Sequence, residues 1–142
     1  MDREFSRVIE ACAAPRDEQD GTWITRDMMR AYCRLHELGV AHSLEVWEEG
    51  ELVGGIYGLS LGPVFFGESM FSHKKDASKV ALVALCRQLQ QWKYTLLDCQ
   101  VTNPHLVSMG SIDISRDQFN ALLDNTDQPD HWQSDFTPES RW

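Results

Sequence analysis

Residues 42–71 read HSLEVWEEGELVGGIYGLSLGPVFFGESMF, and this stretch sets the architecture that the rest of the chain completes. Apolar and polar residues alternate over 42–47, which is the period of a half-buried strand. The polar turn 48–51 leads to an apolar run over 52–61, and Gly62-Pro63 separates that run from a third one over 64–71. Short turns between neighbouring apolar runs are typical of hairpins, so the stretch predicts a three-stranded antiparallel meander.

Helical patterns flank this meander. Residues 2–13 and 26–38 carry apolar residues at helical spacing, with Thr25 as the predicted N-cap of the second helix. The elements expected downstream are a helix over 77–91 capped by Asp76, a strand over 95–101, a short helix after Asn103-Pro104, a strand over 109–114, and a helix over 116–123 capped by Ser115. Because a helix crosses over between strands, the predicted class is α/β, with a mixed α+β sheet and helices on both faces.

The composition is that of one globular domain with an acidic surface. The 142 residues are 42% hydrophobic and carry a formal net charge of −9, which favours a basic partner or a cationic substrate and opposes free-standing nucleic-acid binding. We expect a domain over 1–126 and a tail over 127–142 that aromatic residues attach to it. No apolar run approaches the roughly 20 residues of a membrane span, and the acidic start is unlike a signal peptide, so the expected location is the cytoplasm.

The cysteines and histidines form no ligand pattern. Cys12, Cys33, Cys86 and Cys99 lack a CxxC spacing and lie in apolar surroundings, which predicts reduced, buried thiols. The five histidines show no HxxxH or HxxE set, so no metal site is expected. Nothing resembles a Walker loop or a nucleophile elbow either, and we expect no cofactor.

Asp98 and Gln100 are the first candidates for chemistry. They lie in the expected strand, where alternation places both on one face, about 7 Å apart. A strand reached through a crossover helix is expected inside the sheet, where polar side chains are costly unless something uses them. Alternatively, Asp98 caps a neighbouring helix and Gln100 satisfies buried main chain, and the strand alone favours neither interpretation.

Two further positions are candidates. Glu68 follows Gly67 in the aromatic run FFGESMF, where its carboxylate is paired, faces solvent or faces a cleft, and the glycine leaves room for a close approach. The pattern alone favours a solvent-facing carboxylate. Trp23 lies in a loop before a helix cap. Such tryptophans mostly cover the core, and a minority stack on a ligand ring such as a nucleobase.

A series of motifs in a fixed order resembles one known family. The motifs are GTWIT (21–25), LHELG (35–39), AHS (41–43) with EVW (45–47), LVGG (52–55), GESMFS (67–72), DASK (76–79) and DCQV (98–101). Together they closely resemble leucyl/phenylalanyl-tRNA–protein transferases, the bacterial enzymes of the N-degron pathway, over about residues 5–124. The resemblance implies a GNAT-type acyltransferase fold, whose opening strand would precede Met1. It also implies that Leu or Phe, with Met as a further donor, passes from aminoacyl-tRNA to the α-amine of a protein beginning with Arg or Lys.

The resemblance also implies roles for individual residues. It places Asp98 and Gln100 at the catalytic centre with Glu68 beside them, and it matches Trp23 to a tryptophan that stacks on the terminal adenosine of the tRNA. The aminoacyl side-chain pocket and its surroundings fall on Ile56, Phe65, Gly67, Leu82, Leu85, Leu97 and Asn103. We expect Gln100 to hydrogen-bond the attacking amine while Asp98 polarises Gln100 and helps to drain the proton, with no metal or nucleophile required.

The sequence departs from the family in two ways. The family's N-terminal domain, which helps to clasp the tRNA, has no counterpart here, and Ile56 and Leu85 stand where methionine and phenylalanine are expected. One alternative is therefore a non-catalytic module that binds basic N-termini. Another, less favoured, is a CoA-dependent N-acetyltransferase, which needs a glycine-rich pyrophosphate loop after the third strand of the meander. Residues 72–78 contain no glycine.

Overall fold

The structure, a computed structural model, describes residues 1–14, 24–124, 129–130 and 132–133. Its elements follow the predicted order with one strand fewer. They are helices α1 (Phe5–Ala13) and α2 (Arg26–Glu37), strands β1 (Ala41–Glu48), β2 (Glu51–Leu61) and β3 (Val64–Ser72), helix α3 (Ala77–Gln91), strand β4 (Leu96–Asp98), and helices α4 (Pro104–Ser108) and α5 (Arg116–Leu123).

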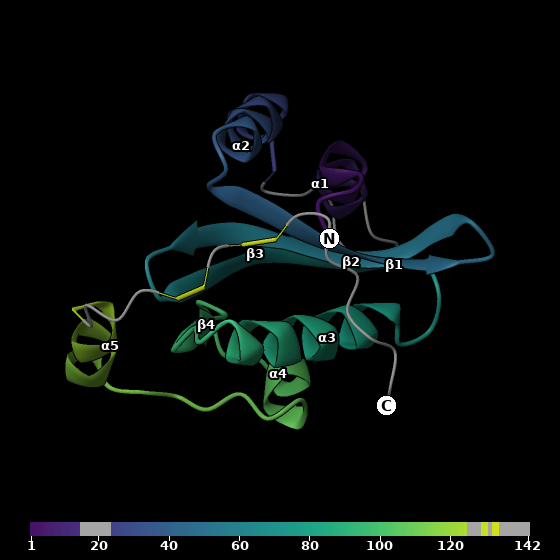
Figure 1. Ribbon diagram of the computed structural model, residues 1–142. Coiled ribbons are helices and arrows are strands. Elements are labelled where there is room, and N and C mark those ends of the chain that lie inside the picture. Colours follow the sequence, from purple (N-terminus) through teal and green to yellow (C-terminus); the bar gives the residue numbers. More distant parts are fainter. Residues whose placement is uncertain (15–23, 125–128, 131, 134–142) are drawn as a thin grey trace.

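The four strands form one sheet in the order β1-β2-β3-β4 (Figure 1). β1 pairs with β2 and β2 with β3, both antiparallel, which confirms the meander. After α3 the chain returns to β3, and β4 runs parallel to it. The predicted mixed sheet is thus confirmed and agrees with an α+β acyltransferase-like fold. The expectation that this last strand lies inside the sheet is wrong, because β4 is the edge strand of the sheet that the described residues form.

The sheet separates two hydrophobic cores. α1 and α2 cover one face and α3 covers the other, with α4 and α5 on the side of α3 (Figure 1). The core under α1 is built around Val8, Ile9 and Tyr57, and the core over α3 around Phe65 and Leu85, all of them removed from solvent. Burial of apolar surface is the main favourable contribution to folding, so this layered packing positions the groups described below.

Two of the three predicted helix caps are present. The Thr25 hydroxyl accepts a hydrogen bond from Met28 N, and Ser115 forms a capping box with Gln118. The third is wrong, because Asp76 occupies the N-cap position of α3 without a capping hydrogen bond and has a left-handed φ of 63°. Its carboxylate bonds Lys79 instead, which lowers the pKa of Asp76.

The predicted strand over 95–101 is confirmed only for Leu96–Asp98. It ends early because Gln100 has a φ of 65°, a left-handed conformation that a strand cannot continue. The turn is closed by Val101 N, which donates to Cys99 O at 2.7 Å.

The predicted strand over 109–114 is wrong for this described part of the chain. The N–H groups of Gly110 and Ser111 donate to the carbonyls of Val107 and Leu106. These bonds satisfy the end of α4, so the main chain closes a helix there instead of pairing with a strand.

The cysteines differ in burial. All four are free, but only Cys12 is buried, while Cys33 and Cys99 are half-buried and Cys86 is exposed. The predicted burial is therefore wrong for Cys86, which lines the groove between α3 and β4 described below. Within the described ranges, none of the helices has the length and apolar character that crossing a membrane requires.

The tail contacts the domain through Trp132. Its ring stacks on His42 with 4.3 Å between centroids and on Phe65 with 5.5 Å. Asp130 N donates to Trp92 O at 2.8 Å. These contacts agree with the expectation that aromatic residues attach the tail.

Candidate functional site

Glu68 lies at an irregularity of β3. Tyr57 of β2 pairs with Ser69, and Gly58 pairs with Gly67, so Glu68 has no residue opposite it and forms a β-bulge. A bulge re-aims a side chain out of the regular alternation of its strand. Of the possibilities that the sequence left open, pairing is found, and a simple solvent-facing carboxylate is wrong: Glu68 is half-buried and both of its oxygens are bonded.

The Glu68 carboxylate joins three elements. The Tyr32 hydroxyl of α2 donates to Oε2 at 2.8 Å, and Gln100 Nε2, just after β4, donates to Oε1 at 3.1 Å. Because a carboxylate only accepts, the amide of Gln100 is fixed with its NH2 group toward Glu68 and its Oε1 directed elsewhere. We call Tyr32, Glu68, Asp98 and Gln100 the Glu68 network.

Asp98 acts on the main chain of Gln100. Its Oδ1 accepts the Gln100 N–H at 2.8 Å, a local bond of the kind that Asp side chains make in turns. The expected placement of both side chains on one strand face is therefore wrong, since a tight turn brings them together. The left-handed conformation of Gln100 costs about 1–3 kcal/mol, and such conformations cluster at functional sites.

Asp98 and Gln100 line an open groove of about 880 Å³. This volume is within the roughly 300–1,000 Å³ of ligand clefts. Leu82 of α3 and Leu97 of β4 also line it, and residues 110–116 form its far wall. The groove thus brings together four residues of the predicted site, and Glu68 is connected to it through Gln100.

Three other predicted pocket residues lie in the core. Ile56, Phe65 and Leu85 are at most 4% exposed and pack between the sheet and α3. The Trp132 ring lies over Phe65 in a stacked contact. These three side chains therefore do not line the groove, although Leu82 and Leu97 of the same core do.

The remaining predicted site residues are Gly67, Asn103 and Trp23, and the structure gives a different result for each. A Cβ added to Gly67 would lie 3.5 Å from the Asp98 carbonyl oxygen, an ordinary contact, so packing of β3 against β4 does not demand glycine. Asn103 is exposed, and its side chain accepts from Leu106 N as the N-cap of α4, which is a structural role. Trp23 lies outside the described residues.

Tyr32 is the member of the Glu68 network that the sequence did not single out. It belongs to the apolar stripe of α2 and has no motif of its own, so its spacing indicates only a core residue. Burial, and next the hydrogen bond to Glu68, raise the pKa of the Tyr32 phenol above its ordinary value, which keeps the hydroxyl a donor. Only the bulge in β3 brings Glu68 within its reach, and no local pattern encodes that pairing.

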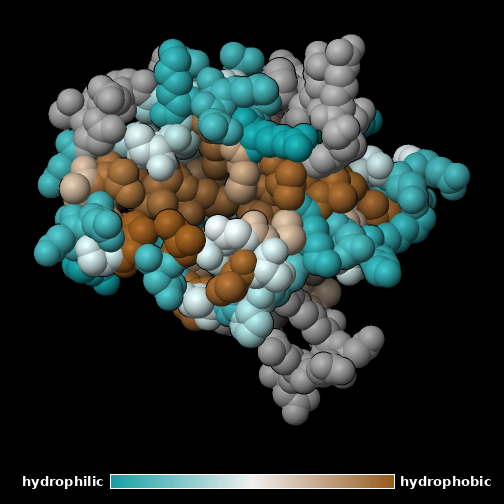
Figure 2. Space-filling view, turned by 90° about the horizontal axis from the view of Figure 1, so that it is seen from below, coloured by the Kyte–Doolittle hydropathy of each residue, from teal (hydrophilic) through white to brown (hydrophobic). Residues whose placement is uncertain are grey.

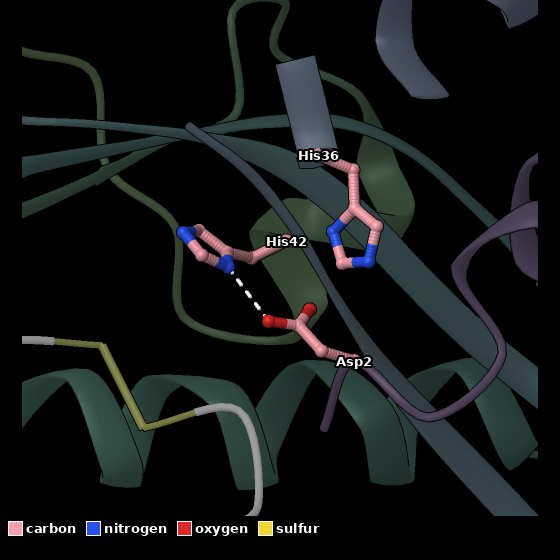
Figure 3. Close-up of side chains that lie close together, drawn as sticks. All are labelled: Asp2, His36 and His42. Carbon is pink, nitrogen blue, oxygen red and sulfur yellow. Dashed lines mark hydrogen bonds and ion pairs between the residues drawn. The ribbon is translucent and has the colours of Figure 1, made fainter. Parts of the chain in front are cut away.

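A second polar cluster, Asp2, His36 and His42, lies at the start of β1 (Figure 3). One ligand atom of each lies within 4.8 Å of the others, a grouping that the histidine spacing did not reveal. The Asp2 carboxylate accepts from His42 Nδ1 at 2.7 Å. His42 Nε2 lies 3.1 Å from Gly39 O, and His36 Nδ1 lies 2.8 Å from Ala41 O. A metal ligand directs a lone pair at its ion, whereas these nitrogens face acceptor oxygens, so the geometry is that of a hydrogen-bonded tie between the first residues, α2 and β1.

Known proteins resemble this chain over most of its length. The sequence profile described as leucyl/phenylalanyl-tRNA protein transferase matches residues 1–124. A relative from Hahella chejuensis is 58% identical over 124 residues, which cover 87% of this chain and 53% of the relative. Relatives from Cellvibrio japonicus and Nitrosomonas europaea are 52% and 53% identical, and the matches cover 100% and 99% of this chain but 62% and 61% of those proteins.

All three relatives carry the name leucyl/phenylalanyl-tRNA–protein transferase. This chain spans between about half and three-fifths of their length. The matched residues include the whole sheet, the groove and every member of the Glu68 network. The chain therefore belongs to the leucyl/phenylalanyl-tRNA protein transferase family.

Proposed function

We propose that the protein transfers leucine or phenylalanine, with methionine as a further donor, from aminoacyl-tRNA to the α-amine of proteins that begin with Arg or Lys, as in the N-degron pathway. The observation that carries this proposal is the hydrogen bond between Glu68 and Gln100, which holds a carboxamide beside Asp98 at the groove. The names of the relatives supply the reaction class.

The reaction makes modest demands on a catalyst. The amine nitrogen attacks the carbonyl carbon of an ester that is already activated. A C–N bond forms, the C–O bond to the ribose breaks, and the ribose oxygen takes up the proton that the amine gives up. Because an α-amine has an ordinary pKa of about 7.7–8.0, the protein mainly has to orient the neutral amine and stabilise the tetrahedral oxyanion.

Gln100 is suited to orient the amine. Its NH2 group is committed to Glu68, so its Oε1 is the end that accepts a hydrogen bond from the attacking nitrogen. Glu68 then has the orienting role that the sequence suggested for Asp98. Asp98 holds the turn through Oδ1, and we assign its second oxygen to receive the proton that the amine loses.

The charges near the groove favour a cationic acceptor. Glu68 and Asp98 are carboxylates on either side of Gln100, and the chain as a whole carries a formal charge of −9. An acceptor that begins with Arg or Lys brings two positive groups, its amine and its first side chain. Attraction over this range raises the rate of encounter more than the final affinity.

A module that only binds basic N-termini is the second candidate, and the position of Trp132 favours it. The Trp132 ring covers Phe65, which the family resemblance assigns to the aminoacyl pocket. A donor side chain therefore reaches Phe65 only when Trp132 moves away. In that case the carboxylates would still attract a basic amino end without any transfer.

Transfer of radiolabelled leucine or phenylalanine from charged tRNA to an Arg-initiated protein tests the proposal. We expect transfer by the wild-type chain and a loss of about 10²–10³-fold in Gln100→Ala, the usual cost of removing an oriented polar group from a reacting centre. Gln91→Ala is the matched control, because Gln91 is exposed on α3 outside the groove. Wild-type binding of the acceptor without transfer would favour the binding module, and equal transfer by Gln100→Ala would overturn the assigned role.

A further inference from the structure

The groove extends well beyond the Glu68 network. Seen from below the view of Figure 1, hydrophobic side chains gather in a broad band across the face that carries α3, α4 and α5 (Figure 2). Two of the groove residues, Val101 and Ile112, are 72% and 82% exposed, the highest exposed fractions among the large hydrophobic side chains of the described residues. The proposed chemistry uses the Gln100 end, and the family resemblance assigns Leu82 and Leu97 to the aminoacyl pocket, so Val101 and Ile112 remain without a role.

One wall of the groove is an open strand edge. β4 pairs with β3 on one side, and no described strand pairs with its other side. The Asp98 carbonyl lies toward β3, 3.5 Å from the position of a Cβ on Gly67. Successive residues of a strand direct their main-chain groups to opposite edges, so the N–H and C=O of Leu97 are directed to the free edge, where no described main-chain group bonds them.

Carboxylates lie close to Gln100 in the groove. Asp98 precedes Gln100 in the turn, and Asp113 on the far wall accepts a hydrogen bond from the Thr102 hydroxyl, just beyond Gln100. Two carboxylates thus lie at the Gln100 end. Two arginines also line the groove, Arg87 of α3 and Arg116 of α5.

We propose that the groove binds the first residues of the acceptor polypeptide in an extended conformation, as a strand added antiparallel to β4. An antiparallel strand whose amine lies beside Gln100 places its first residue opposite Cys99 and its third residue opposite Leu97. The third residue then exchanges two main-chain hydrogen bonds with Leu97, as in other cases of strand addition. The inference rests on the proposed function for the identity of the strand, an acceptor with a free basic amino end.

The shape of the groove favours a single chain over a second copy of the protein. Its lining comes from β4 on one side, residues 110–116 on the other and α3 between them. The edge of another folded sheet would bring with it the helices that cover its two faces (Figure 1). A lone extended strand has no such flanking layers.

Binding of N-methylated peptides tests the strand directly, without tRNA. The probe is a short fluorescent peptide with a free amine, Arg first and apolar residues after it, and the readout is fluorescence anisotropy with the full chain. Methylation of the third residue's nitrogen removes the donor to Leu97 and should weaken binding about tenfold. Methylation at the second residue, whose N–H faces the other way, should leave the affinity unchanged, and any other pattern overturns the strand register.

Two protein variants test the location. Ile112→Asp places a charge on the exposed apolar wall and should weaken binding of the unmodified peptide about tenfold, whereas Leu38→Asp, at a residue 60% exposed outside the groove, should not. Equal affinities of the two variants for the peptide would overturn the groove as the binding surface. Concentration-dependent dimerisation that Ile112→Asp abolishes would assign the groove to a second copy of the protein instead. Transfer without this binding pattern would leave the proposed function intact and overturn the inference. The binding pattern without transfer would support the inference and overturn the proposed function.

Discussion

The Glu68 network and the Asp2 cluster are built from similar groups but differ in their surroundings. Each has a carboxylate that accepts two hydrogen bonds and ties together distant parts of the chain. The Asp2–His42 pair is buried, with both ring nitrogens of His42 facing acceptors. The Glu68 network instead opens on a groove through the exposed Gln100. The comparison teaches that a satisfied, closed cluster stabilises a fold, whereas one that leaves an oriented acceptor at a cleft is suited to chemistry.

Of the substitutions that compare the two clusters, that of Glu68 should have the largest effect. The Glu68 carboxylate accepts from the Tyr32 hydroxyl and from the Gln100 amide. In Glu68→Gln one of these two donors faces an NH2 group in place of an acceptor oxygen, so the Gln100 amide loses its fixed orientation. We expect kcat of transfer to fall about a hundredfold, with little change in KM for the acceptor or in Tm, since misplacement of an orienting group costs about that much. Glu51→Gln, at an exposed position of β2, is the control. Transfer at the wild-type rate would remove the distinction between the two clusters.

Substitution of His42 should act on stability instead. His42→Ala leaves the buried Asp2 carboxylate without one of its donors, which should lower the free energy of unfolding by about 3 kcal/mol. For a chain of this size Tm then falls by roughly 10 °C, measurable by differential scanning calorimetry. His73→Ala, at an exposed histidine, should change Tm little. A normal Tm combined with lost transfer would show that the Asp2 cluster takes part in the reaction.

Removal of the Tyr32 hydroxyl should have a smaller effect on transfer. Tyr32→Phe deletes one of the two hydrogen bonds to Glu68 and should reduce kcat about tenfold. Tyr94→Phe is a close control, because its hydroxyl bonds Ser60 at 2.6 Å away from the Glu68 network. Both variants lose one half-buried hydrogen bond, so similar Tm values with different kcat values would separate positioning from stability. Equal kcat values would contradict a positioning role for Tyr32.

The smallest effect concerns the phenol protons of the tyrosines, that of Tyr32 among them. Burial is the main cause that raises the pKa of each of the three tyrosines, Tyr32, Tyr57 and Tyr94. The unfolded chain, with an ordinary pKa of about 10, releases these protons first, so stability should be unaffected below that pH and should fall as the pH rises above it. Phenolate absorbance near 295 nm should therefore appear only together with loss of the circular dichroism signal. A tyrosine that titrates near pH 10 in the folded protein would contradict this.

Local patterns predicted most of the fold. The meander, the helices before and after it and two of three caps follow from periodicity and cap residues, because these depend on neighbours within a few positions. Two of the errors share a cause. Asp76 and Gln100 adopt left-handed conformations that non-glycine residues seldom take, so neither the lost cap nor the early end of β4 was readable from residue type.

Sequence motifs singled out three residues of the Glu68 network but did not predict how these residues are arranged. The motif around Asp98 and Gln100 and the carboxylate of Glu68 are visible in the sequence, and the structure brings these three together. Their hydrogen bonds differ from the expected ones, since Glu68 rather than Asp98 holds the Gln100 side chain. Ile56, Phe65 and Leu85 are buried in the core and do not line the groove. The sequence pattern of apolar residues does not distinguish core residues from residues that line a pocket.

The amino-acid sequence by itself determined the family, the alternation of strands and helices, and which polar residues were available for chemistry. Those properties reside in residue type and short-range spacing. Only the tertiary structure decided that β3 bulges at Glu68, that Tyr32 reaches it, and that the second edge of β4, on which no described strand pairs, borders a groove. Each of these depends on main-chain pairing or packing between residues far apart in the chain, where the free energy of the whole fold outweighs local preference.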